Sequence, residues 1–156
     1  ALSSTREFLL MDVEGNPCVK AQAYISILDL VRNRPVRFSD TDLARYQPEP
    51  DTVIETPVKK IAVPKEFIAE KTLVVRRSDI DFNEHVHNTT YLTIAMEVLP
   101  EELYKEQNFQ AIRINFKKAL FLDDVATIKL AQTEQGYTVA IYKEADQLCC
   151  LVDFVV

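Results

Sequence analysis

Thr89-Thr-Tyr-Leu-Thr-Ile-Ala-Met-Glu-Val-Leu99 is the stretch of this 156-residue chain that decides the fold. Its apolar side chains recur at the three- and four-residue spacing of one helix face. They are Tyr91, Leu92, Ala95, Val98 and Leu99. Because Ile94 and Met96 lie outside that stripe, we expect the helix to be covered on most of its sides. The pattern predicts a helix enclosed by other elements.

Strand-like apolar segments lie on both sides of this helix. One strand-like segment precedes the helix, over 70–77. After the helix, Pro100 begins a second, short helix over 101–107. Four more strand-like segments follow, over 109–117, 125–131, 137–142 and 148–156, with turns at Gln135-Gly136 and at 145–147. A strand, an apolar helix and an antiparallel meander predict a sheet wrapped around a long helix, which is the α+β hot-dog arrangement.

The first third of the chain differs in composition from this region. Gly15 lies in a turn between two apolar runs, which predicts a β-hairpin. Residues 33–64 then carry five of the seven prolines, so we expect little regular structure there apart from a short helix over 40–46. The predicted organisation is a hairpin unit over 1–38, a linker over 39–64 and a second domain over 65–156.

Charge and hydropathy argue against several classes of protein. The net charge of −6 argues against a nucleic-acid partner, since such proteins carry a basic face. No apolar run approaches the roughly 20 residues of a membrane helix, and the start shows no signal peptide, so we expect a cytoplasmic protein. The pair Lys117 and Lys118 is interpreted either as a solvated face or as a docking site for an acidic partner.

The three cysteines show no C-x-x-C spacing, which argues against a zinc or redox motif. Reduced thiols are therefore the expectation. Cys149 and Cys150 are neighbours on a predicted strand, where successive side chains point to opposite faces. We expect one of them in the core and the other more exposed.

Asp79-Ile-Asp-Phe-Asn-Glu-His-Val-His-Asn-Thr-Thr-Tyr91 holds both histidines of the chain, directly before the predicted helix. His85 can take and return a proton near neutral pH. Asp81 or Glu84 could orient its imidazole, and Asn83 can donate to a carbonyl. Unpaired N–H groups at the helix start suit a developing oxyanion, where losing one donor costs about 3–4 kcal/mol of barrier. This set of groups fits acyl transfer to water.

Structural explanations compete with catalysis at this segment. His85 and His87 could bind a metal with Asp81 and Glu84, but zinc sites use three or four well-spaced ligands, and no further histidine or suitable cysteine is available. We therefore predict neither a metal nor another cofactor. Asn88 is favoured as a helix N-cap, and His87 is interpreted as a packing or loop residue.

The same region resembles a known signature. Arg76-Arg-Ser-Asp-Ile-Asp-Phe-Asn-Glu-His-Val-His-Asn-Thr-Thr-Tyr91 is similar to the R-R-x-D-x-D-x-N-x-H-V-N-N-x-x-Y pattern of acyl-acyl carrier protein (acyl-ACP) thioesterases of the bacterial type. It departs from that pattern only at His87, where asparagine is usual. Segments 4–8 and 28–37 resemble strands of the family's first domain, so the resemblance covers nearly the whole chain.

The resemblance implies tandem hot-dog domains that end fatty acid synthesis by hydrolysing fatty acyl-ACP. The partner would be acyl carrier protein with its phosphopantetheine-linked acyl chain, and the product a free fatty acid. Matched residue by residue, Asp81, Asn83 and His85 fall on the catalytic positions. We expect Asn88 and His87 to support them or to contribute to an oxyanion site.

Two departures from the family bear on mechanism and assembly. Plant relatives use a glutamate and a cysteine on a later strand, and the aligned residues here are Ala119 and Leu120. The resemblance then implies a water activated by His85, with Asp81 orienting the imidazole and Asn83 polarising the carbonyl.

The first domain also resembles only part of its counterpart, because residues 1–38 supply just a hairpin. Apolar surface left exposed there favours pairing with a second copy, as a homodimer, or with a missing segment. Two other functions stay open. One is a non-catalytic module that binds acyl chains or carrier protein, and the other is another hot-dog enzyme of acyl thioesters, such as a dehydratase.

Overall fold

The computed structural model describes residues 2–32, 34–55, 60–144 and 146–156, which form two compact units. Unit 1 comprises residues 1–59 and unit 2 residues 60–156. Their boundary falls inside the predicted linker 39–64. The turn predicted at Ala145 and the linker residues 56–59 lie outside the described residues.

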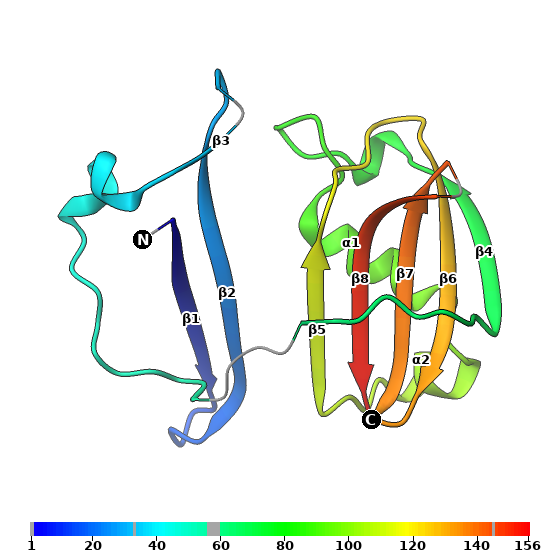
Figure 1. The fold of residues 1–156 in the computed structure, drawn as a ribbon. Coiled ribbons are helices and arrows are strands. Elements are labelled where there is room, and N and C mark those ends of the chain that lie inside the picture. Colours follow the sequence, from blue (N-terminus) through cyan, green and yellow to red (C-terminus); the bar gives the residue numbers. More distant parts are fainter. Residues whose placement is uncertain (1, 33, 56–59, 145) are drawn as a thin grey trace. The chain divides into compact units, whose positions relative to one another are not determined.

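Unit 1 is a three-stranded antiparallel sheet with the order β1-β2-β3 (Figure 1). The strands are β1 (Ser3–Met11), β2 (Pro17–Asp29) and β3 (Arg34–Val36). The predicted hairpin is confirmed as β1–β2, with Gly15 at φ +87° in its turn. The prediction that this region holds only a hairpin is wrong, because β3 pairs with the end of β2. Two 3-10 helices, Phe38–Asp40 and Asp42–Arg45, replace the single helix predicted over 40–46.

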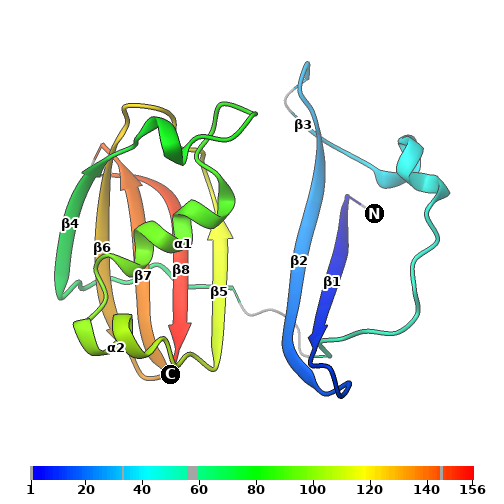
Figure 2. The same ribbon diagram turned by 180° about the vertical axis from the view of Figure 1, so that it is seen from behind.

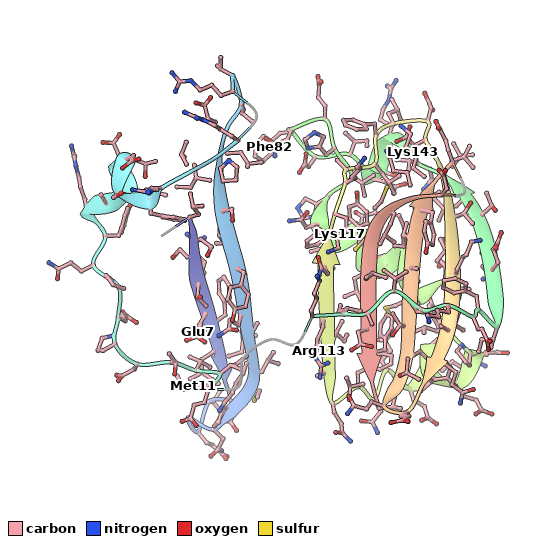
Figure 3. All side chains as sticks on the ribbon, in the orientation of Figure 1. Glu7, Met11, Phe82, Arg113, Lys117 and Lys143 are labelled. Carbon is pink, nitrogen blue, oxygen red and sulfur yellow. The ribbon has the colours of Figure 1, made fainter. Side chains whose placement is uncertain are left out.

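One carboxylate ties the proline-rich segment to this sheet. Glu7 of β1 accepts hydrogen bonds from the N–H groups of Val53 (2.8 Å) and Ile54 (3.2 Å) and from the Gln22 amide (2.7 Å) (Figure 3). These donors hold the pKa of Glu7 below its ordinary value. No described residue of unit 1 is fully buried, and several of its apolar side chains, such as Phe8, are exposed.

Unit 2 contains the predicted hot-dog arrangement. Its five-stranded antiparallel sheet has the order β4-β6-β7-β8-β5, and helix α1 lies across one face (Figure 2). The strands are β4 (Ala69–Val74), β5 (Ala111–Phe116), β6 (Val125–Thr133), β7 (Gly136–Lys143) and β8 (Gln147–Val155). The helices are a 3-10 turn (Arg77–Asp79), α1 (Asn88–Met96) and α2 (Glu101–Glu106).

The position of β5 corrects the predicted meander. Only β6, β7 and β8 follow one another across the sheet, whereas β5 lies at the far edge beside β8. The reason is that β4 already pairs with β6 from Ala69↔Leu130 to Val74↔Val125. The free edge of β8 is therefore the place where β5 can join the ladder.

The core lies between α1 and the inner face of the sheet. Side chains alternate along each strand, so every second residue of β6, β7 and β8 meets the helix. The buried set includes Ile128, Leu130, Val139, Ile141, Val152 and Phe154, packed with Tyr91, Ile94 and Ala95 of α1. The opposite face of the sheet is crossed by residues 60–68 (Figure 1).

Helix α1 is shorter than predicted, ending at Met96 instead of residue 99. The last turn tightens, because the N–H of Glu97 bonds to the carbonyl of Ile94 and the N–H of Leu99 to that of Met96. Pro100 follows, and a residue before proline is disfavoured in helical geometry. The helix predicted over 89–99 was therefore too long at its C-terminal end, although its apolar residues do fill the core.

The prediction that one of the two adjacent cysteines is exposed is also wrong. Cys149 and Cys150 are both 0% exposed. The pairing of β7 with β8 shifts here, from Ile141↔Cys150 to Tyr142↔Leu148, so Cys149 is the extra residue of a β-bulge. A bulge interrupts the alternation of faces, which allows both neighbours to face the interior.

Candidate functional site

The polar segment begins on an ion pair between the exposed side chain of Arg76 and the buried carboxylate of Asp79. Asp79 is 5% exposed, and its carboxylate accepts from the N–H (2.8 Å), Nε (3.2 Å) and a terminal guanidinium nitrogen (3.1 Å) of Arg76. Burial raises the pKa of Asp79, but the bonds from Arg76 outweigh it and bring the pKa below its ordinary value. The Asp79 carbonyl also accepts from the His87 N–H (2.9 Å), so this pair anchors both ends of the segment.

Between these anchors the chain forms a tight loop closed by a bridge between Ile80 and Val86. The Asp81 N–H donates to the His85 carbonyl (2.8 Å), and the Asp81 carboxylate accepts from the Asn83 N–H (2.8 Å). Glu84 takes the left-handed conformation (φ 64°) that reverses the chain. Val86 is buried and donates its N–H to the Leu120 carbonyl (2.9 Å), which fixes the loop on the core.

Asp81 and Asn83 are brought together by the loop. A second, weak contact joins the Asn83 amide to the Asp81 carboxylate at 3.5 Å. Desolvation raises the pKa of Asp81, but the donors from Asn83 prevail and lower it. Asp81 is therefore charged at neutral pH and is directed toward Asn83. Within the described residues, no hydrogen bond links its carboxylate to the imidazole of His85.

His85 is exposed, and its ring packs against a single aromatic side chain. The ring centroids of His85 and Phe121 are 5.1 Å apart at an interplanar angle of 78°, which is an edge-to-face contact. The imidazole nitrogens have no hydrogen-bond partner within the described part of the chain. The ring is accessible to a substrate or a water and is held on one side only.

The predicted N-cap is corrected by the structure, because His87, not Asn88, caps α1. The Thr89 N–H donates to His87 Nδ1 (3.2 Å), and the Thr90 N–H donates to the His87 carbonyl (2.9 Å). Asn88 is the first helical residue, and its N–H has no partner in the described ranges. Of the early helix donors, the Asn88 N–H is thus the one left for an oxyanion.

Capping predicts how His87 tolerates substitution. We expect His87→Ala to lower the free energy of unfolding by about 1 kcal/mol, since alanine offers no acceptor to the Thr89 N–H. His87→Asn should be neutral or stabilising, because asparagine is among the best N-caps. Urea denaturation of the three proteins checks this, and equal stability of the alanine and asparagine variants would contradict the capping role.

The segment after β5 lies next to the loop in the fold. It contains Ala119 and Leu120, the two positions aligned above with the glutamate and cysteine of plant relatives. Leu120 is 0% exposed, and its N–H donates to the Tyr91 hydroxyl (2.8 Å). Burial raises the pKa of Tyr91 to about 12, so this hydroxyl stays neutral. Ala119 and Leu120 therefore connect the strand to α1 and supply no acid or nucleophile.

Sequence reasoning missed three residues, of which one contacts His85 and the other two are linked to it through that contact. Phe121 contacts its ring, Asp124 accepts from the Phe121 N–H (2.9 Å), and Lys143 binds Asp124 (2.8 Å). All three are distant from His85 in sequence, and no local pattern marks them. Across the described ranges, no group of three or more His, Cys, Asp or Glu side chains is arranged to hold a metal ion.

Comparison with known families decides the identity. The family described as acyl-ACP thioesterase C-terminal domain matches residues 63–151, more than half of the chain. The chain belongs to the acyl-ACP thioesterase family. The matched residues contain the whole loop and the strands from β4 to the first half of β8.

Curated relatives agree with this family. The chain is 25% identical over 99 residues to oleoyl-acyl carrier protein thioesterase 2, chloroplastic, of Arabidopsis thaliana, covering 64% of this chain and 27% of the relative. It is 36% identical over 50 residues to oleoyl-acyl carrier protein thioesterase 1 of the same plant, covering 32% and 14%. The matched regions are well under two thirds of these relatives' length.

Solved acyl-ACP thioesterases share the fold. An enzyme from Bacteroides thetaiotaomicron aligns with a TM-score of 0.81 at 21% identity, over 99% of this chain and 63% of that one. The 12:0-ACP thioesterase from Umbellularia californica aligns with a TM-score of 0.78 at 13% identity, over 97% and 61%. The predicted hot-dog fold is thereby confirmed. No helix in the described ranges has the length and apolar character to cross a membrane.

Proposed function

We propose that this chain hydrolyses fatty acyl-ACP to a free fatty acid and ACP. The observation that carries the proposal is the loop of residues 80–86, which is fixed to the core at both ends and leaves the side chains of Asn83 and His85 exposed. A rigid loop with an accessible base and an amide donor is suited to attack on a thioester carbonyl.

In the proposed reaction, His85 takes a proton from a water, and the hydroxide attacks the thioester carbonyl carbon. The Asn83 amide and the Asn88 N–H donate to the oxygen that becomes negative. The carbon–sulfur bond then breaks, and the imidazolium returns its proton to the leaving thiolate. Asp81 orients Asn83 through its two contacts.

The thiols of unit 2 support water as the nucleophile. Cys149 and Cys150 are fully buried, and burial raises the pKa of both, that of Cys150 to about 12. A cysteine acts as a nucleophile in its thiolate form, which requires the opposite shift and solvent access. Leu120, at the position of the plant relatives' cysteine, has no reactive group.

Thiol release from acyl-ACP tests the proposal. The 156-residue chain is mixed with acyl-ACPs of several chain lengths, and free ACP thiol and free fatty acid are measured together. We expect both products in equal amounts and with repeated turnover. Acyl-CoA in a parallel reaction tests whether the carrier protein itself is needed.

Two other outcomes would replace the proposal. Binding of acyl-ACP without any product would favour a non-catalytic module, an alternative that Ala119 and Leu120 motivate. Conversion of a 3-hydroxyacyl thioester to an unsaturated one, with the thioester intact, would indicate a dehydratase. The two outcomes are separated by mass spectrometry of the acyl group.

Carrier docking gives a prediction for the lysines after β5. Lys117 and Lys118 are exposed, precede Phe121 by a few residues and form no ion pair with the described residues. We expect Lys117→Glu with Lys118→Glu to raise KM for acyl-ACP about tenfold with little change in kcat, through lost attraction to an acidic carrier. Steady-state kinetics at low and high salt measure this, and the effect should shrink with salt.

Lys105→Glu, compared with Lys117→Glu alone, is the control for charge, since each replaces one lysine by glutamate. Lys105 lies on α2, at the opposite end of the sheet from the segment that follows β5 (Figure 1). It should leave KM nearly unchanged. An equal effect of both changes would show that net charge, not the Lys117–Lys118 surface, governs carrier binding.

A further inference from the structure

His85 is held by one contact, so whatever fixes Phe121 also limits the orientation of the imidazole. An exposed histidine without hydrogen bonds can occupy several rotamers. The edge-to-face packing on Phe121, with centroids 5.1 Å apart, favours one of them. Phe121 is itself 44% exposed, and surrounding side chains hold it only in part.

Phe121 is fixed through its backbone and one carboxylate. Its N–H donates to Asp124 Oδ2 (2.9 Å), and its carbonyl accepts from the Asp124 N–H (3.2 Å). The Asp124 carbonyl also accepts from the N–H of Val75, the residue after β4 (2.9 Å), and the Val75 carbonyl accepts from the Asp123 N–H (3.1 Å). The turn that carries Phe121 is thus locked onto the end of the sheet.

A lysine from β7 completes this arrangement. Lys143 Nζ lies 2.8 Å from Asp124 Oδ1, and both side chains are largely covered, at 24% and 14% exposure. The same ammonium lies 5.7 Å from the centroid of the Phe121 ring, within the range of a cation–π contact. The hydrogen bond to Asp124 raises the pKa of Lys143, so the ammonium stays charged. Figure 3 places Lys143 at the end of unit 2 where Phe82 of the polar loop also lies.

We propose that Asp124 and Lys143 are positioning residues for His85, acting through the ring of Phe121. The proposal rests on the proposed function, in which His85 is the base. The ion pair holds the turn and the ring, and the ring holds the imidazole in the orientation that faces the substrate. A base that occupies its productive orientation less often lowers kcat in proportion, while substrate affinity is nearly unaffected.

The chain has only two histidines, so the ring signals of His85 can be followed directly. NMR spectra of the histidine ring C–H groups are recorded for the wild type, and His87→Asn assigns the other set. We expect Phe121→Leu to shift the His85 signals, because the ring current of the neighbouring aromatic is lost, and to leave those of His87 in place. We expect Phe121→Tyr to keep the wild-type signals, since the ring remains.

Lys143→Met and Asp124→Asn test the remote part of the proposal. Both should shift the His85 signals in the same direction as Phe121→Leu and reduce kcat about threefold to tenfold without a matching change in KM. Lys143→Arg should restore both, because it keeps the charge. Lys129→Met is the control, since the Lys129 side chain is covered to the same extent as that of Lys143 (25% exposed) and forms an ion pair with the more exposed Glu70 (3.2 Å) in the same sheet.

Specific results would overturn the proposal. Unchanged His85 signals and kcat in a folded Lys143→Met protein would do so, as would an equal response to Lys129→Met. If Asp124→Asn fails to fold, the comparison of Lys143→Met with Lys143→Arg still tests the proposal. If the wild type has no turnover but the His85 signals respond as expected, the positioning holds and the proposed hydrolysis fails.

Discussion

His85→Ala is expected to reduce kcat for acyl-ACP hydrolysis by about 100- to 10,000-fold, the range that a general base contributes. The side chain is exposed and forms one aromatic contact, so its removal should change stability by no more than about 1 kcal/mol. Loss of turnover with an intact fold would therefore report on chemistry. Thiol release under saturating substrate measures kcat, and urea denaturation measures stability.

His87→Asn is the control for this change, since it alters the only other histidine and keeps a capping group on α1. It should retain most of the wild-type turnover. Unchanged hydrolysis by the folded His85→Ala protein would remove His85 from the mechanism. Equal losses in the two variants would instead indicate that the whole loop, not one base, had been disturbed.

Gly136→Ala is expected to destabilise unit 2 by roughly 3–5 kcal/mol. Gly136 has φ +140°, a conformation reserved for glycine. A Cβ there would lie 2.1 Å from the Phe154 carbonyl oxygen, at the end of the β7–β8 ladder, where Gly136 pairs with Val155. The strands would have to separate. Hydrogen exchange of the β7 and β8 amides measures the loss.

Gly15→Ala is the matched comparison, because Gly15 is the other glycine of the chain. It also has positive φ, at +87°, but a Cβ added there meets nothing within 4 Å. Only backbone strain of about 1–2 kcal/mol is expected, confined to the β1–β2 hairpin. If both substitutions cost the same, the contact with Phe154 is not the cause.

Local patterns explain how much of the fold could be predicted. The two glycine turns mark hairpins because few other residues adopt positive φ, and the apolar spacing of residues 89–99 identified the central helix. The polar loop before that helix was also predicted, and Asp81, Asn83 and His85 do lie within one short loop. Their catalytic roles stay predictions.

What was missed depends on pairing between distant segments. Strand β5 pairs with β8 because β4 already pairs with β6 at the other edge of the sheet. The bulge at Cys149 follows from the register of β7 and β8. The cap was misassigned by one residue because asparagine is the better cap by preference, whereas the anchor at Asp79 sets the actual start of α1. Phe121 and Lys143 reach His85 only through the folded sheet.

The bulge at Cys149 has a practical consequence for labelling. With Cys149 and Cys150 enclosed, Cys18 on β2 is the exposed thiol among the three cysteines of the chain. A maleimide dye should therefore couple at one site per folded molecule, in unit 1, with no cysteine replaced. Unfolding would raise that stoichiometry from one to three, so dye incorporation becomes a direct count of chains whose second unit has opened.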